Sequence, residues 1–229
     1  MGMPEVSIGY FPDVGGSYFL SRLPGELGLY LGVTGAQVRA ADALYARLAD
    51  WCLPSNLLAE FDRRLDNMVW ATPPLEALCT LLATVAANKI PGAELKAFRH
   101  VIDEYFSIPD LQSIREALLT ETRPEFQDWA EETVKLLDSR SPLAMSVTLE
   151  LLRYGRTLSL VDCFKLELHL NHQWFAKGDV MEGVRALIID KDKKPNWSPP
   201  SLAQVSTGQA RNFFSGFQPP NGKARSRSD

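Results

Sequence analysis

The stretch MPEVSIGYFPDVGGSYFLSRLPG, residues 3–25, decides how the rest of the chain is interpreted. Apolar and small side chains alternate over residues 6–10, which predicts a short β-strand. Pro12 then breaks this strand, and Gly15 and Gly16 predict a tight turn into a helix. Glycine-rich turns of this kind commonly serve a sheet or a ligand, and the sequence around this one supplies almost no sheet.

Outward from this stretch the chain is predicted to be mainly helical. Residues 27–33 are almost entirely apolar and predict a buried helix that ends at Gly35. Residues 37–54 predict a short helix followed by a brief strand within 48–54. Apolar residues at helical spacing then predict helices over 57–69, 74–87, 94–106, 109–121, 124–137, 142–153 and 160–175. The expected fold class is therefore mainly α with a small β remnant.

The same pattern predicts three segments along the chain. Residues 1–54 hold the glycine-rich stretch and the β remnant, and residues 55–200 form a helical region. Its last part is a short helix followed by a polar turn with three prolines, EGVRALIIDKDKKPNWSPP. Residues 201–229 end in a polar, basic sequence, so we expect this tail to be partly disordered.

Composition excludes several classes of protein. The 229 residues carry a net charge of −4, so no global basic field would attract nucleic acid or anionic lipid. Runs of 18–20 apolar residues are absent from the sequence, as is a signal peptide, which favours a soluble, cytoplasmic protein without a membrane partner. Cys52, Cys79 and Cys163 show no metal-ligand spacing and predict three buried thiols. His169 and His172 share a helix face but lack a third ligand, so we expect no metal site.

Two carboxylates stand out in the first stretch. Glu5 and Asp13 each lie next to a proline, with apolar residues between them. Burial raises the pKa and the basicity of a carboxylate, and two acids in different environments can divide acid and base roles. From residue types alone, the structural alternatives are stronger. Glu5 would face solvent, and Asp13 would cap the following helix.

A longer sequence pattern favours functional roles for Glu5 and Asp13 over the structural ones. The chain reads MPE-x-x-IG-x-FPDVGG-x-YFL-x-RL at residues 3–23 and EGVRALIIDKDKKPNW at residues 182–197, with a Ser-Pro helix start at residue 141. In this order, the motifs resemble those of 3-hydroxyisobutyryl-CoA hydrolases, a branch of the crotonase superfamily. The resemblance runs from Met3 to about Pro199. It implies the C-terminal part of the crotonase (ClpP/crotonase) α/β spiral fold.

The resemblance also implies an activity and a set of site residues. The activity is hydrolysis of 3-hydroxyisobutyryl-CoA in valine catabolism, with an acyl-CoA substrate and no cofactor, coenzyme A being part of the substrate. Glu5 would act as general base or as nucleophile, two roles that the sequence leaves open. Asp13 would bind the β-hydroxyl of the substrate or assist proton transfer. Gly15 and Gly16 fit packing better than phosphate binding, and Lys191 is either a solvated turn residue or a contact to coenzyme A phosphates.

Relatives of this kind carry the two N–H donors of their oxyanion hole, and most of their sheet, before the MPE motif. Only Met1 and Gly2 precede it here. We therefore expect an incomplete, weakly active or inactive chain, partnered by an N-terminal crotonase half or by copies of itself. Two alternatives stay open: an enoyl-CoA hydratase or isomerase, and a non-catalytic helical module for oligomerisation or binding.

Overall fold

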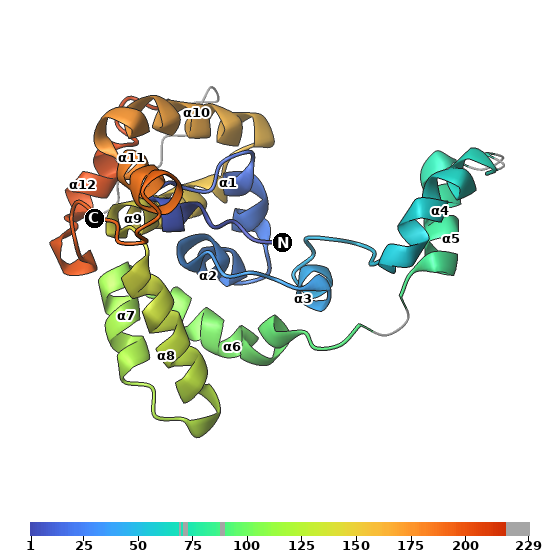
Figure 1. The fold of residues 1–229 in the computed structure, drawn as a ribbon, viewed down its shortest axis with the longest axis horizontal. Coiled ribbons are helices and arrows are strands. Elements are labelled where there is room, and N and C mark those ends of the chain that lie inside the picture. The colour runs from blue at the N-terminus through green and yellow to red at the C-terminus, as the bar shows by residue number, and fades with distance from the viewer. Residues whose placement is uncertain (69, 71–72, 88–89, 219–229) are drawn as a thin grey trace. The chain divides into compact units, whose positions relative to one another are not determined.

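A computed structural model describes residues 1–68, 70, 73–87 and 90–218 (Figure 1). The chain forms two compact units, Met1–Gln37 with Phe98–Asp229, and Val38–Ala97. The boundaries expected at residues 54 and 200 differ from this division. The expected boundaries mark which residues would correspond to the core of the crotonase fold, and they stay a prediction.

Helices make up the regular structure of both units. The first unit contains η1 (Glu5–Ile8), α1 (Gly16–Phe19), η2 (Leu20–Arg22), α2 (Leu27–Thr34), most of α6 (Glu94–Phe106), α7 (Leu111–Leu119), α8 (Pro124–Ser139), α9 (Pro142–Gly155), α10 (Leu160–Lys177), α11 (Val180–Val184), the π-helical turn η3 (Arg185–Ile189), η4 (Leu202–Gln204) and α12 (Thr207–Asn212). The second unit contains α3 (Ala40–Tyr45), α4 (Ser55–Asp66), α5 (Pro74–Val85) and the start of α6.

The predicted β remnant is wrong for the part of the chain that the structure describes, which contains no strand. The alternating residues 6–10 lie in and just after the 3₁₀-helix η1, where Ser7 N donates to Pro4 O and Tyr10 N donates to Glu5 O, the local bonds of a helical turn. The second predicted strand, 48–54, is irregular. Leu48 N and Ala49 N donate to Ala43 O and Pro54 O accepts from Leu57 N, all local bonds, and Cys52 O accepts from Ala87 N. Alternation specifies a strand only where a neighbouring strand accepts its hydrogen bonds.

The helix predictions are largely confirmed, and so are several of their ends. Gly35 ends α2 in the left-handed conformation with φ 66°. Ser141 caps α9 by accepting a bond of 3.0 Å from Ala144 N. Pro124 is the first residue of α8, where its missing N–H leaves no bond unmade.

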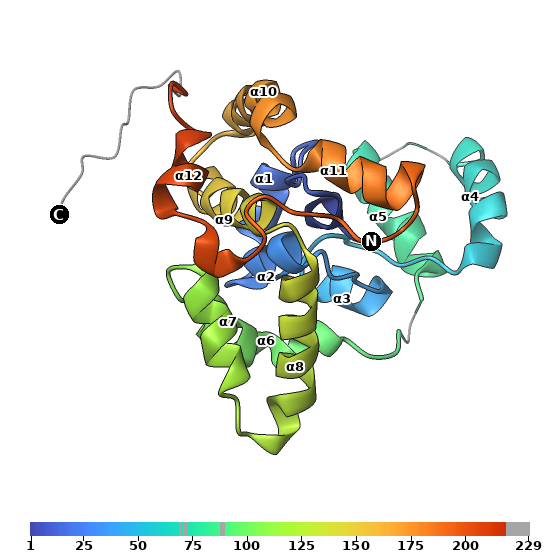
Figure 2. The same ribbon diagram turned by 60° about the vertical axis from the view of Figure 1, so that its left-hand side comes forward.

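The core of the first unit surrounds α2. All eight residues of α2 are buried, and the helix packs on α9 (Figures 1 and 2). This contact needs glycine. A Cβ at Gly28 would lie 1.8 Å from the backbone oxygen of Leu20, and one at Gly32 would lie 2.6 Å from a methyl group of Leu152. The glycines therefore set how closely α2 approaches η2 and α9.

Substitution of Gly28 by alanine tests that approach. We expect a loss of about 3 kcal/mol of unfolding free energy, because the methyl group meets backbone that cannot move without shifting η2. Urea denaturation followed by circular dichroism measures the loss. Gly208→Ala is the matched control, since its Cβ would meet nothing within 4 Å and alanine favours the helix. Equal stability of the Gly28→Ala variant and the native chain would refute the packing described for α2.

The second unit has few buried residues. Asp42 is buried in α3 and accepts a bond of 2.9 Å from Leu95 N. No residue of α4 is buried, and Val85 is the one buried residue of α5. The low burial indicates that α4 and α5 contribute little to the stability of the chain.

Part of the tail is ordered within the described residues. η4 and α12 lie in it, and Ala210 and Phe213 are buried. The ring of Phe213 packs 4.9 Å from that of Trp174. Apolar residues up to Phe217 give this part of the tail a surface to bury. The rest of the predicted disordered sequence, from residue 219 on, lies outside the described residues.

Candidate functional site

η1 fixes the position of Glu5. Val6, the next residue, is fully buried, and Gly9 ends the turn in the left-handed conformation. α11 packs directly on this turn, because a Cβ at Gly183 would lie 2.0 Å from Ile8 O. The backbone oxygen of Val6 also accepts a bond of 3.2 Å from Ser141 N at the start of α9. The short turn that carries Glu5 is therefore held from two sides by helices distant in the sequence.

The carboxylate of Glu5 lies in an unusual environment. Its Oε2 atom is buried and has no hydrogen-bond partner among the described residues. Burial, and then the nearby charge of Asp13, raise the pKa of Glu5, opposed by a backbone hydrogen bond. A buried, unpaired carboxylate oxygen is costly to stability, and it is available to accept a proton or a donor from a bound molecule.

Asp13 lies in the turn between η1 and α1. Gly16 N donates to Asp13 O at 2.8 Å, and Val14 and Gly15 follow in left-handed conformations with φ 49° and 88°. The turn brings the two acids within electrostatic range of one another, as the effect of Asp13 on the pKa of Glu5 indicates. The two acids therefore interact electrostatically, while their pairing in catalysis stays a prediction.

The raised pKa of Glu5 gives a pH-dependent prediction. A carboxyl group whose folded pKa exceeds its ordinary value of 4.5 contributes most to stability below that pH, and the contribution is lost as pH rises through the folded pKa. Glu5→Gln removes this titration. We expect the difference in Tm, variant minus native chain, to increase from pH 4 to pH 7 in calorimetry. The other groups titrate in both proteins and cancel. A difference that stays constant or decreases over this range would contradict the desolvation of Glu5.

Glu167, a buried carboxylate on α10 that is 5% exposed, is a residue of the site that the sequence patterns did not predict. It accepts bonds from Gly15 N at 2.9 Å and Ser17 N at 3.0 Å, and a further bond from the hydroxyl of Ser17. A pattern in the sequence could have revealed it. Residues 163, 166, 167 and 170 share one face of α10, and Glu167 is the acidic residue on this otherwise apolar face. Glu167 therefore anchors the turn that follows Asp13.

Tyr10 adds a further polar group beside the acids. Its hydroxyl donates to Asn171 Oδ1 at 3.0 Å, and its ring stacks on Phe11 at 4.4 Å. Burial, and then the charges of Asp13 and Glu167, raise the pKa of Tyr10 to about 12. The phenol is therefore neutral at ordinary pH and acts as a hydrogen-bonding group.

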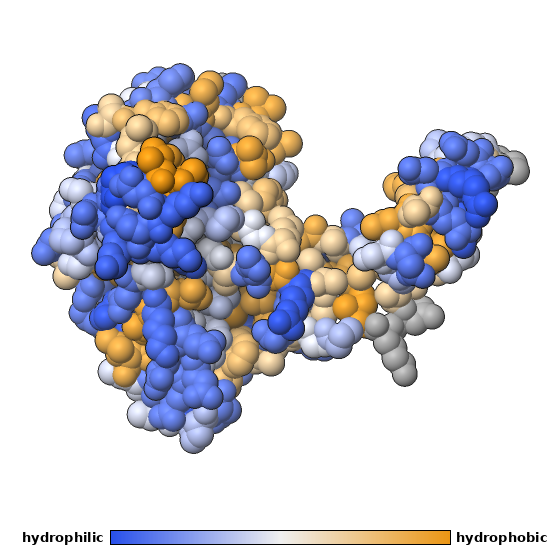
Figure 3. Space-filling view, viewed as in Figure 1, coloured by the Kyte–Doolittle hydropathy of each residue, from blue (hydrophilic) through white to orange (hydrophobic). Residues whose placement is uncertain are grey.

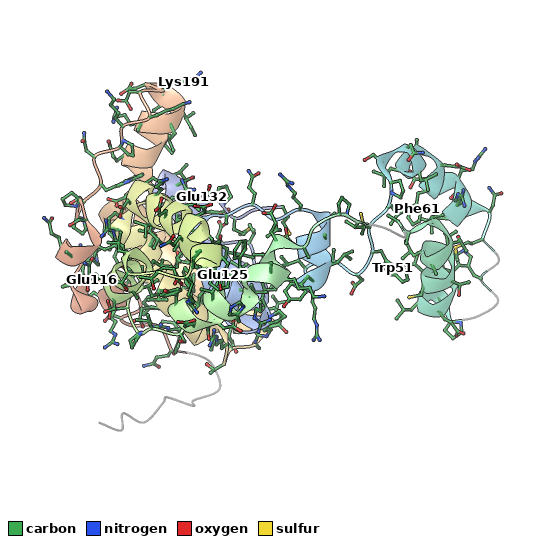
Figure 4. The ribbon with its side chains drawn as sticks, turned by 90° about the horizontal axis from the view of Figure 1, so that it is seen from below. Trp51, Phe61, Glu116, Glu125, Glu132 and Lys191 are labelled. Carbon is green, nitrogen blue, oxygen red and sulfur yellow. The ribbon has the colours of Figure 1, made fainter. Side chains whose placement is uncertain are left out.

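The structure describes the surroundings of the other predicted site residues, Gly15, Gly16 and Lys191, but their roles stay predictions. The N–H of Gly15 is occupied by Glu167, and a Cβ at Gly16 would lie 3.0 Å from Pro12 Cβ, as expected for close packing. Lys191 is exposed at an outer tip of the first unit, in a left-handed conformation with φ 55° (Figure 4). The turn around it is held by Arg185.

Arg185 organises that turn through charge. It donates to Glu182 at 2.8 Å, to Asp190 at 2.6 Å and to Asp192 at 2.8 Å. Hydrogen bonds from Arg185, and then from a backbone N–H, lower the pKa of Glu182 to about 2. The resulting network explains how a polar lysine-rich segment keeps a defined conformation.

Within the part of the chain that the structure describes, no group of three or more His, Cys, Asp or Glu side chains could hold a metal ion. His169 contacts Gln173, with 2.9 Å between the two Nε2 atoms. All three cysteines are free, and the prediction of three buried thiols is wrong for two of them. Cys163 is buried, whereas Cys52 and Cys79 are half-buried.

Comparison with known proteins identifies the class. Residues 1–214 match the enoyl-CoA hydratase/isomerase family, and the chain belongs to that family of the crotonase superfamily. A carnitinyl-CoA dehydratase from Mycobacterium thermoresistibile has a similar structure, with a TM-score of 0.81 and 35% identity. The match covers 96% of this chain and 60% of that one. The expected crotonase relationship is confirmed.

Several curated relatives are named 3-hydroxyisobutyryl-CoA hydrolases. A probable 3-hydroxyisobutyryl-CoA hydrolase of Arabidopsis thaliana is 36% identical, with 93% of this chain matching 57% of the relative. A protein named mitochondrial 3-hydroxyisobutyryl-CoA hydrolase, from Dictyostelium discoideum, is 32% identical, with 93% of this chain matching 55% of it. The chain thus spans little more than half the length of the curated relatives it matches.

The mitochondrial name of the second relative gives no support to the expected cytoplasmic location. Among the described residues, none of the helices has the length and apolar character needed to cross a membrane.

Proposed function

We propose that this chain contributes the acid pair of an acyl-CoA thioesterase that hydrolyses 3-hydroxyisobutyryl-CoA to 3-hydroxyisobutyrate and coenzyme A. The observation that carries the proposal is the buried, unpartnered Oε2 of Glu5 beside the charge of Asp13. The names of the relatives supply the substrate, and valine catabolism is the pathway in which such a hydrolase would act.

The proposed roles follow from the surroundings of each acid. Glu5 takes a proton from water as the water oxygen bonds to the thioester carbon, or its own oxygen attacks that carbon first. In the first route the carbon–sulfur bond then breaks, and coenzyme A leaves as a thiolate that takes up the proton. In the second route the carbon–sulfur bond breaks as Glu5 and the acyl group form an anhydride. Water then hydrolyses the anhydride, which releases 3-hydroxyisobutyrate and restores Glu5, and the proton from water goes to the thiolate. Asp13 binds the β-hydroxyl of the acyl group. This chemistry uses neither a metal ion nor a redox cofactor.

Thioester hydrolysis also needs donors for the oxyanion. Two N–H groups near the acids, those of Gly15 and Ser17, already donate to Glu167 and are not free for this purpose. We propose that the donors come from the portion of the fold that the relatives carry outside the match. Loss of one such donor typically costs a factor of about 10²–10³ in rate, so the isolated chain is expected to be nearly inactive.

A chimera tests the proposal. This chain replaces the matched portion of the Arabidopsis relative, and the chimera and the isolated chain are assayed with 3-hydroxyisobutyryl-CoA and with crotonyl-CoA. We expect hydrolysis by the chimera to exceed that of the isolated chain by at least about 10²-fold. Hydration of crotonyl-CoA without hydrolysis would favour the hydratase alternative. A folded chimera that is inactive on both would favour a non-catalytic module.

A further inference from the structure

One face of α10 bonds at three places to the segment that carries the second acid of the site. Trp174 Nε1 donates to Gly9 O at 2.8 Å. Asn171 Oδ1 accepts from the hydroxyl of Tyr10 at 3.0 Å. Glu167 accepts from the backbone of the turn that follows the acid. Positions 167, 171 and 174 are four and three residues apart, so their side chains lie on one face of the helix.

This bonding face of α10 is turned toward the interior of the first unit. α10 lies along the top of that unit and packs on α1 beneath it (Figure 1). Its other side belongs to the surface, where Figure 3 shows hydrophobic residues and where Phe164 and Leu168 are exposed. The helix therefore contributes its polar contacts to the site from the buried side.

The backbone directly after Asp13 is strained. Val14 has φ 49°, a left-handed conformation that is an outlier for a β-branched residue. Such conformations persist where surrounding contacts fix them, and they cluster at functional sites. The side chain of Val14 is 73% exposed, so it gives the turn little packing of its own. The turn is therefore held by the contacts on either side of it, at Tyr10 and at Gly15.

Tyr10 is the contact before the turn, and aromatic packing holds its ring. The ring stacks on that of Phe11 at 4.4 Å and meets that of Trp174 edge-on at 6.0 Å. Phe11 is fully buried. The charge of Asp13 is among the causes that raise the pKa of Tyr10, so the acid lies within electrostatic range of the phenol. The ring contacts direct the hydroxyl at Asn171.

We propose that Tyr10 is a positioning residue for Asp13. Its bond to Asn171 fixes the near end of the turn, as the bonds of Glu167 fix the far end. Together they set where the Asp13 carboxylate lies relative to Glu5. Tyr10 acts through Asp13 and does not contact the reacting atoms. The inference rests on the proposed function, in which Asp13 binds the β-hydroxyl of the substrate.

Tyr10→Phe tests the proposal, because it removes the hydroxyl and keeps the ring. In the chimera described above, we expect kcat/KM for 3-hydroxyisobutyryl-CoA to fall about tenfold. In an Asp13→Asn chimera the same change should lower it less than about twofold, because the acid that Tyr10 positions is then absent. Tyr105→Phe is the matched control, since Tyr105 also donates to a side chain, Glu121, at 2.9 Å. It should leave kcat/KM unchanged.

Amide hydrogen exchange in the isolated chain gives a readout that needs no activity. Gly16 N donates to Asp13 O at 2.8 Å, so the exchange rate of this amide reports on the turn. We expect Tyr10→Phe to increase that rate about threefold or more, because the turn opens more often once its near end is released. Tyr105→Phe should leave the rate unchanged.

Equal exchange of the Gly16 amide in the Tyr10→Phe variant and the native chain would overturn the proposal. So would a loss of kcat/KM of about tenfold that persists in the Asp13→Asn background, because Tyr10 would then act on another group. Faster exchange at Gly16, together with a chimera that hydrolyses neither thioester, would remove the proposed function. It would leave Tyr10 as the residue that positions the turn of Asp13.

Discussion

Replacement of Glu5 by glutamine is expected to lower the turnover of the chimera by about 10²–10⁴-fold. This is the range that a positioned general base contributes, and the amide can neither accept a proton nor attack the thioester. Glutamine has the shape of glutamate and keeps the turn of η1, so the fold should survive. Steady-state kinetics with 3-hydroxyisobutyryl-CoA give kcat and KM, and circular dichroism verifies the fold.

The control for this prediction is Glu132→Gln. Glu132 is an exposed carboxylate on α8 (Figure 4), so its replacement removes one charge without touching the site. Its kcat should equal that of the parent chimera. Turnover of the Glu5→Gln variant within a factor of about three of the parent would remove Glu5 from the reaction. The role of the acid pair would then have to be abandoned.

The largest expected effect on stability comes from Glu167→Ala. The change leaves the buried N–H groups of Gly15 and Ser17 without an acceptor, and each such loss typically costs about 1–3 kcal/mol. We expect the unfolding free energy to decrease by about 3–5 kcal/mol in urea denaturation. Gly15 lies two residues after Asp13, so the turn that carries Asp13 should also lose its fixed conformation.

Glu132→Ala serves as the matched control here and should change stability by less than about 0.5 kcal/mol, as is usual for exposed sites. Hydrogen exchange gives a second readout. The amides of Gly15 and Ser17 should exchange faster in the Glu167→Ala variant than in the native chain, whereas those of α8 should not. Unchanged protection at these two amides would show that Glu167 does not hold the turn.

The sequence located the acids but not their surroundings. The pattern around Glu5 and Asp13 is local, and local patterns can be read from residue order. The carboxylate that holds the turn after Asp13 is 152 positions from Gly15 along the chain, and no spacing rule connects the two. Its position among apolar residues on one face of α10 was visible, but its partners depend on how α10 packs against α1.

The sequence by itself determined where most helices lie and where several of them begin and end. Apolar periodicity, the cap at Ser141 and the glycine at residue 35 act within a few residues of the positions they govern. Only the tertiary structure decided that residues 5–8 form a 3₁₀-helix in place of the predicted strand, and that Glu5 Oε2 is buried without a partner. Strand pairing and burial depend on residues brought together from distant parts of the chain, and local preference cannot fix them.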